Sequence, residues 1–154
     1  MRRYVRDDKI VYFEKGLHHR PDGPAIEWNW GRKEWKIHGV LHRDDGPAVI
    51  DPFEGDQWYI HGKLHRTDGP AILSKRVEIW WLNDKRHRED GPAYIHRDGA
   101  QQWYKHGKLH RTDGPANIDS NGTMRWYIEG IEYTFNGWIT ITGNDAVSMK
   151  LTWF

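Results

Sequence analysis

The sequence predicts an all-β fold, an elongated antiparallel meander of about five 22–23-residue β-hairpin repeats with terminal caps. The first observation is a motif, His-Arg-x-Asp-Gly-Pro-Ala, whose five copies begin at evenly spaced residues, namely His19, His42, His65, His87 and His110. A fixed period of this length is typical of repeat architectures. The second observation is that short runs of alternating apolar and polar residues, separated by turn residues, flank each motif, which indicates strands rather than helices.

A two-residue turn precedes each motif and predicts the first hairpin of the repeat. These turns are Lys15-Gly16, His38-Gly39, His61-Gly62, Asn83-Asp84 and His106-Gly107. Such turns need positive φ, which Gly, Asn, Asp and His tolerate best. With the turn at His61-Gly62, Tyr59 faces Leu64 and Ile60 faces Lys63. Trp58 then faces His65, so we expect the repeated Trp and the motif His to be cross-strand neighbours on one face.

A second strand follows the second to fifth motifs, in residues 48–50, 71–73, 93–95 and 116–118, and ends at turns such as Asp98-Gly99, whereas the first unit departs from this pattern with Glu27, Trp28 and Trp30. The alternation places the motif Ala and the repeated Trp on one face, which we expect to be the core. A sixth unit keeps Trp126 and its partner Tyr133 but lacks the motif. The predicted organisation is therefore a single repeat domain, 1–154, with an N-terminal cap (1–11), five hairpin repeats (12–118), a degenerate sixth repeat (119–136) and a C-terminal capping hairpin (137–154).

The composition argues against several classes of function. The formal net charge is +1, so no global field attracts nucleic acid or an anionic membrane, and the local concentration of basic residues is limited to Arg2, Arg3 and Arg6. The absence of Cys excludes disulfides and thiolate chemistry. The sequence shows no signal peptide and no apolar run long enough to span a membrane. We expect a cytoplasmic protein.

The spacing Trp-x3-Gly-x2-His-x3-Gly, with the next Trp about 23 residues on, resembles the MORN repeat family over roughly residues 10 to 130. The His-Arg-x-Asp-Gly-Pro-Ala motif departs from the common MORN pattern and is similar to a variant met in predicted phage and large DNA virus proteins. The resemblance implies a hairpin-repeat sheet with a scaffold or binding role, located in the host cytosol for a phage protein. It implies no catalytic residues and no particular ligand.

Each motif carries an Arg and, two residues later, an Asp. Equal numbers of these residues favour an ion-pair ladder between neighbouring units, with Asp also accepting backbone N–H groups. The ladder residues are Arg43, Asp45, Arg66, Asp68, Arg88, Asp90, Arg111 and Asp113, with Arg20 and Asp22 in the first motif. The competing interpretation, a phosphate channel of five Arg, is weaker because each guanidinium has a carboxylate alongside.

Metal binding and catalysis find little support in the sequence. The pairs His38/His42, His61/His65 and His106/His110 have a spacing that would suit a metal on a helix, but a turn lies inside each pair and no third ligand recurs. Packing of the motif His against Trp explains them better. We therefore expect no metal, no cofactor, no catalytic residues and no enzyme, although a site that uses Trp28, Trp30 or His96 stays open.

The residue after each repeated Trp faces the other side of the sheet, where aromatic residues predominate. We expect these residues to form a binding stripe together with cationic and His residues of the hairpins, namely Tyr59, Trp81, Tyr104, Tyr127, Lys63, Lys85, Lys108, His61 and His106. An alternative is that both faces of the sheet are packed. The stripe predicts a non-enzymatic binding module for a partner protein, and the resemblance suggests a phage inhibitor that occludes a host defence protein. The alternative function is a sponge, or less plausibly a hydrolase, for an anionic nucleotide immune signal.

The C-terminal run 147–154 is apolar, lacks Pro and carries one charge, at Lys150. Exposed strand edges pair readily with other chains. Trp153 and Phe154 at the end of this run are costly to leave in water, so the sequence favours a homodimer through the C-terminal hairpin over a simple cap.

Overall fold

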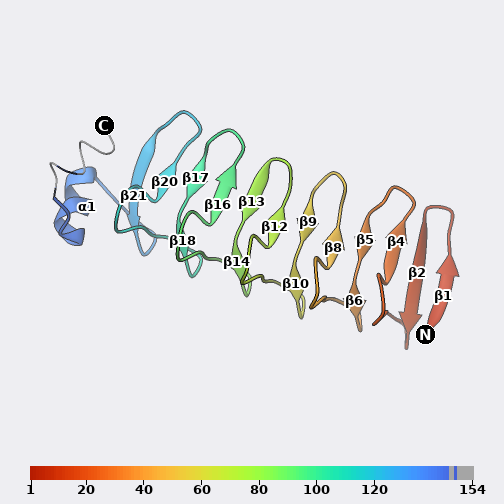
Figure 1. Cartoon of the computed structure of the whole chain (residues 1–154). Helices are drawn as coiled ribbons and strands as arrows, with labels where there is room; N and C mark the ends of the chain where they lie inside the picture. Colours follow the sequence, from red (N-terminus) through yellow and green to blue (C-terminus); the bar gives the residue numbers. More distant parts are fainter. Residues whose placement is uncertain (146–147, 149–154) are drawn as a thin grey trace. The chain divides into compact units, whose positions relative to one another are not determined.

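The computed structural model describes residues 1–145 and 148, and it confirms an antiparallel meander of β-hairpin repeats (Figure 1). Apart from the short helix α1 (Phe135–Thr142), the regular elements of the described residues are strands. The chain packs as two compact units, Met1–Lys75 with Trp81–Asp84, and Arg76–Trp80 with Lys85–Phe154. No helix in the described part of the chain has the length and apolar character needed to cross a membrane.

Each unit contains a run of antiparallel main-sheet strands. In the first unit these are, in spatial order, β1 (Arg2–Val5), β2 (Lys9–Glu14), β4 (Ile26–Trp28), β5 (Lys33–Glu34), β8 (Val49–Ile50), β9 (Asp56–Gln57) and β12 (Ile72–Leu73), with β3 (Leu17–His18) paired to β2. In the second unit they are β13 (Val77–Ile79), β16 (Tyr94–His96), β17 (Gln101–Gln102), β20 (Asn117–Ile118), β21 (Met124–Ile128) and β22 (Ile131–Tyr133). Spatial order follows chain order, as expected for a meander.

Short hairpins project between the main-sheet strands at the predicted turns. They are β6 (Lys36–Ile37) with β7 (Val40–Leu41), β10 (Tyr59–Ile60) with β11 (Lys63–Leu64), and β18 (Tyr104–Lys105) with β19 (Lys108–Leu109). The equivalent strands β14 (Trp81–Leu82) and β15 (Lys85–Arg86) belong to the first and second unit respectively.

The structure confirms the predicted turn residues and register. Tyr59 pairs with Leu64, and the His65 N–H donates to the Trp58 carbonyl over 3.1 Å. Every predicted turn residue has positive φ, and these residues are Lys15, Gly16, His38, Gly39, His61, Gly62, Asn83, Asp84, His106 and Gly107. The degenerate sixth repeat also pairs Trp126 with Tyr133, as the sequence predicts.

Each hairpin turn packs closely on the hairpin before it. The Gly62 N–H donates to the Leu41 carbonyl over 2.8 Å, and the Arg43 N–H donates to the Tyr59 carbonyl over 3.1 Å. Gly62 has a φ of 78°, and a Cβ at this position would lie 2.8 Å from Val40 Cγ1. Glycine therefore satisfies two demands here, the left-handed backbone and the close approach of successive turns.

The Trp and Ala face is packed, and so is the opposite face of the main sheet, where Val11, Ile26 and Val49 are buried. The motif alanines Ala25, Ala48, Ala71, Ala93 and Ala116 are fully buried. The backbone N–H of Trp58 donates to the Ala71 carbonyl over 2.8 Å, and the Arg66 guanidinium lies 4.1 Å from the centroid of the Trp58 ring. The same Arg covers the aromatic ring in the other motif-bearing repeats, at 3.9–4.2 Å. This cation–π contact covers part of rings that are half-buried in the folded protein.

The predicted C-terminal hairpin is wrong in its first strand, because residues 138–142 belong to helix α1. Thr134 caps the helix by accepting the Gly137 N–H, and Gly143 ends it in the left-handed conformation. Trp138 is fully buried and donates its indole N–H to the Arg111 carbonyl over 3.0 Å. The alternation of apolar residues with Thr favours a strand locally, but the caps and the burial of Trp138 favour a helix. The second predicted strand, 147–154, with the proposed dimer contact, lies outside the described residues except for Ser148.

We expect Trp58→Ala to lower the free energy of unfolding by about 3 kcal/mol, because it removes a large aromatic ring and the surface on which Arg66 stacks. Urea denaturation followed by circular dichroism measures this change. Phe53→Ala removes an aromatic residue that is 79% exposed and should change stability by no more than about 0.5 kcal/mol. Equal losses in the two variants would contradict the assignment of the core face.

Candidate binding surface

The predicted aromatic residues lie on the sheet face opposite the Trp and Ala face. Tyr59 donates its hydroxyl to Gln57 Oε1 over 3.1 Å, and Tyr104 donates to Gln102 Oε1 over 3.2 Å. Each Gln stands two residues before its Tyr, so the two side chains share a face. Tyr127 donates to Glu132 Oε2 over 2.9 Å. These three tyrosines, like Trp81, are half-buried, so most of each ring already packs against the protein.

The cationic half of the predicted stripe lies elsewhere. Lys63 pairs with Ile60 rather than with Tyr59, and Lys108 pairs with Lys105 rather than with Tyr104. A shift of one position along a strand moves a side chain to the opposite face, so these lysines point away from the tyrosines. Lys85, His61 and His106 are exposed at or beside the turns. The single aromatic and cationic stripe expected from the sequence is therefore wrong.

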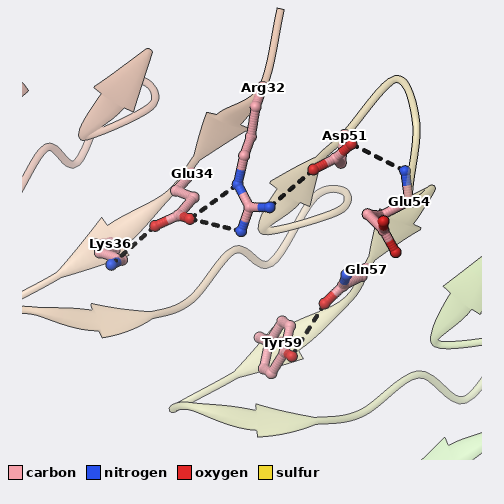
Figure 2. Close-up of polar contacts among 7 residues, drawn as sticks. All are labelled: Arg32, Glu34, Lys36, Asp51, Glu54, Gln57 and Tyr59. Carbon is pink, nitrogen blue, oxygen red and sulfur yellow. Dashed lines mark hydrogen bonds and ion pairs between the residues drawn. The ribbon is translucent and has the colours of Figure 1, made fainter. Parts of the chain in front are cut away.

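A polar network occupies the tyrosine face of the first unit, and the sequence reasoning missed it (Figure 2). Arg32 donates from Nε and Nη2 to Glu34 Oε1, over 3.2 and 2.9 Å, and from Nη1 to Asp51 Oδ2 over 2.8 Å. Lys36 Nζ lies 2.9 Å from Glu34 Oε2. The Phe53 and Glu54 N–H groups donate to the second oxygen of Asp51. The alternation of Arg32, Glu34 and Lys36 along the chain is the sequence signal that indicates this network.

The surroundings keep both carboxylates of this network ionised. Burial would raise the pKa of Glu34, but hydrogen bonds from Lys36 and Arg32 hold it below its ordinary value. Burial would also raise the pKa of Asp51, but hydrogen bonds from the N–H groups of Glu54 and Phe53 and from the Arg32 guanidinium hold it below its ordinary value. Lowered values suit acceptors of permanent ion pairs rather than general acids at neutral pH. The network therefore has the properties of a structural element.

The Arg and Asp ladder exists, but its pairs form within motifs rather than between neighbouring units. Arg66 Nε donates to Asp68 Oδ1 over 2.8 Å, and its Nη1 donates to the Pro70 carbonyl over 3.3 Å. The Arg66 guanidinium lowers the pKa of the Asp68 carboxyl. The other motifs repeat this arrangement, in the pairs Arg20–Asp22, Arg43–Asp45, Arg88–Asp90 and Arg111–Asp113. The Arg side chains are mostly buried, whereas the Asp carboxylates are exposed and held in fixed positions.

The side chains of the motif His residues contact the next repeat, whereas their backbone N–H groups donate to the Trp or Tyr carbonyl of their own repeat. His42 Nδ1 accepts the His61 N–H over 3.1 Å, and the two rings stack at 4.5 Å. His19 with His38, and His87 with His106, repeat the arrangement. Where the turn residue is Asn83, His65 Nδ1 instead lies 3.0 Å from the Asn83 side-chain oxygen. The interpretation as packing against Trp missed this contact, because it joins residues 18 or 19 positions apart.

In two of these stacks, the two imidazoles and a carboxylate bring three atoms of the type that bind metals within 4.8 Å of one another. The two clusters are Glu14 with His19 and His38, and His87 with Glu89 and His106. However, Nδ1 of His19 and of His87 accepts a backbone N–H, so the neutral ring carries its proton on Nε2. A metal bound at Nε2 would displace this proton to Nδ1, where it would break the hydrogen bond that joins the two repeats. The geometry therefore favours a hydrogen bond from Nε2–H to the carboxylate over metal ligation.

Grooves between successive motif loops recur at equivalent places in the two units. In the first unit, residues 20–24 and 42–45 line a groove of about 660 Å³ together with Trp35, Ile37 and His61. In the second unit, residues 88–92, 103–105 and 110–113 line a groove of about 530 Å³. Each groove combines a Trp, Pro and Gly residues, and the exposed carboxylate of a motif Asp. The loop grooves, defined by these residues, are the repeated concave feature of the surface.

We expect Asp51→Asn to lower the free energy of unfolding by about 1–3 kcal/mol at pH 7, because a buried ion pair with Arg32 is lost while the backbone hydrogen bonds can persist. The Asp51 pKa is lowered by folding, so its contribution is present above the unfolded value near 4 and is lost as pH falls through the folded value. The difference between wild type and variant should therefore shrink in urea titrations from pH 7 to pH 3. Glu54→Gln, an exposed neighbour, is the control. A difference that is constant across this range would contradict the ion pair.

No protein-family model matches the chain, and no curated protein is similar enough to it to count as a relative. The resemblance to MORN repeats thus depends on the motif spacing alone.

Proposed function

We propose that the protein is a non-enzymatic binding module that docks a partner protein along its loop grooves. The observation that carries this proposal is the recurrence of one groove type at equivalent loops in both units. A protein partner can use several equivalent contacts at once, and linked weak contacts multiply into useful affinity. A site for one small substrate would instead be expected at a single place that breaks the repeat.

The chemistry of the loop grooves supports a protein partner. Trp35 and Trp103 supply the aromatic surface that is typical of energetic centres in interfaces. Around them, exposed carboxylates such as Asp45 and Asp113 are fixed by Arg43 and Arg111. Acceptors that are already ordered lose little entropy on binding. The expected partner therefore presents apolar side chains flanked by Lys or Arg.

The remaining acidic groups support a non-enzymatic role. Glu34 and Asp51 are buried acids, and both are occupied by Arg32 or Lys36. The resemblance to phage MORN-like proteins makes a host defence protein the target class that we propose, with inhibition by occlusion. Nucleotide sequestration on the repeats receives less support, because Tyr59 and Lys63 lie on opposite faces and each motif Arg is paired with Asp.

A pair of loop substitutions tests the proposal. Asp44→Lys with Thr112→Lys places long cations at the mouths of the loop grooves without changing a motif Arg or Trp. The tagged protein captures its partner from a lysate of the native host, and titration then measures Kd for the recovered partner. We expect the substituted protein to bind at least about tenfold more weakly, which corresponds to about 1.4 kcal/mol.

The matched control is Glu54→Lys with Ser120→Lys. Both pairs add three positive charges, two from the acidic residue and one from the neutral residue. Glu54 and Ser120 are exposed in main-sheet turns outside the loop grooves. We expect the control to retain its affinity within about threefold. Equal weakening in both pairs, or full affinity in the loop pair, would overturn the proposal.

A further inference from the structure

A separate pocket of about 720 Å³ lies over the β1–β2 hairpin. Its lining includes Arg2 and Tyr4 from β1, Arg6 directly after it, Phe13 and Glu14 from the end of β2, and Lys15 from the turn that follows. Alternate residues of a strand share a face, so Arg2 and Tyr4 project to the same side, about 6.7 Å apart. Arg2 is also directly paired with Phe13. This volume is within the range of small-ligand sites.

The aromatic residues of the pocket form a continuous row. Tyr4 meets Phe13 edge-on at 5.7 Å, and Phe13 lies 4.4 Å from His18. Tyr4 is 43% exposed, which leaves one side of its ring open to a ligand. A planar heterocycle can stack on such a ring regardless of its base identity.

The cations of the pocket are not used elsewhere. Within residues 1–145 and 148, Arg2, Arg6 and Lys15 make no ion pair, whereas each motif Arg has its Asp. The one carboxylate of the lining, Glu14, lies 3.4 Å from His19 Nε2. Three cations therefore face one acid that already has a partner. The pocket combines positive charge with an open aromatic ring on one face, which the repeats do not.

We propose that this pocket binds a nucleotide, with the base stacked on Tyr4 and the phosphate groups held by Arg2, Arg6 and Lys15. Arg2 and Arg6 line the pocket on either side of Tyr4 along the chain, so a phosphate one sugar away from the stacked base can reach an arginine. Guanidinium groups bind phosphate oxygens through paired hydrogen bonds. The ligand is either a free nucleotide or the phosphorylated end of a single strand. The site is independent of the loop grooves, so either proposal can fail without the other.

Isothermal titration at low salt tests the site with ATP, AMP, adenosine, inorganic pyrophosphate and a 5′-phosphorylated DNA decamer. We expect ATP to bind more tightly than AMP, and adenosine and pyrophosphate alone to bind at least about tenfold more weakly than ATP, because each lacks one half of the recognition. Tighter binding of the decamer than of ATP would identify a strand end as the source. Weaker binding of the decamer would identify a free nucleotide.

Single substitutions on one strand provide the controls. Arg2→Ala should weaken ATP binding about tenfold, whereas Arg3→Ala removes the same charge from the opposite face of β1 and should change it less than about twofold. Tyr4→Ala should weaken binding, and Tyr4→Phe should retain it. Equal losses in Arg2→Ala and Arg3→Ala would overturn the proposal in favour of unspecific charge attraction. The proposal would also be overturned if millimolar ATP gave no binding heat with protein that circular dichroism shows to be folded.

Discussion

The hydrogen bond that His19, His42, His87 and His110 accept from the next hairpin turn is the constraint on which the repeat architecture depends. In the stacks at His19, His42 and His87, Nδ1 accepts the N–H of a turn His, and the two imidazoles lie face to face. The bond fixes the tautomer, so Nε2 carries the proton and points to the acids Glu14, Asp44 and Glu89. Both ring nitrogens are therefore in use, Nδ1 by the next turn and Nε2 by a carboxylate.

The repeated motif residues make contacts that stabilise the fold. The guanidinium of Arg66 covers Trp58, donates to Asp68 and donates to the Pro70 carbonyl. Five donors in a rigid plane suit this combination, which Lys could not reproduce. Repetition of the motif therefore reflects repetition of a structural unit, and it does not by itself indicate a repeated ligand. Function must be sought in groups that these contacts leave available, such as the exposed Asp carboxylates and the cations of the β1–β2 hairpin.

Features set by local geometry could be predicted from the sequence. Turn residues such as His61-Gly62 follow from the need for positive φ, and the pairing of Tyr59 with Leu64 follows from the position of the turn. Features that depend on contacts between repeats could not be predicted in this way. The stack of His42 on His61 and the bonds from Arg32 to Asp51 join residues 19 positions apart, and their faces depend on how hairpins stack. Helix α1 was missed because its alternating Thr and Ile residues favour a strand, whereas burial of Trp138 decides the outcome.

The ion network around Arg32 addresses a problem that near-identical repeats create. Strands with the same pattern can pair with the wrong copy, since apolar contacts alone distinguish poorly between equivalent partners. Glu34 lies in a row of paired residues of the sheet that also holds Val11, Ile26, Val49 and Gln57. A strand paired out of place would bury Glu34 or Asp51 without Arg32, which costs several kcal/mol. A buried ion network that adds little to stability can therefore still favour the correct neighbour over the others.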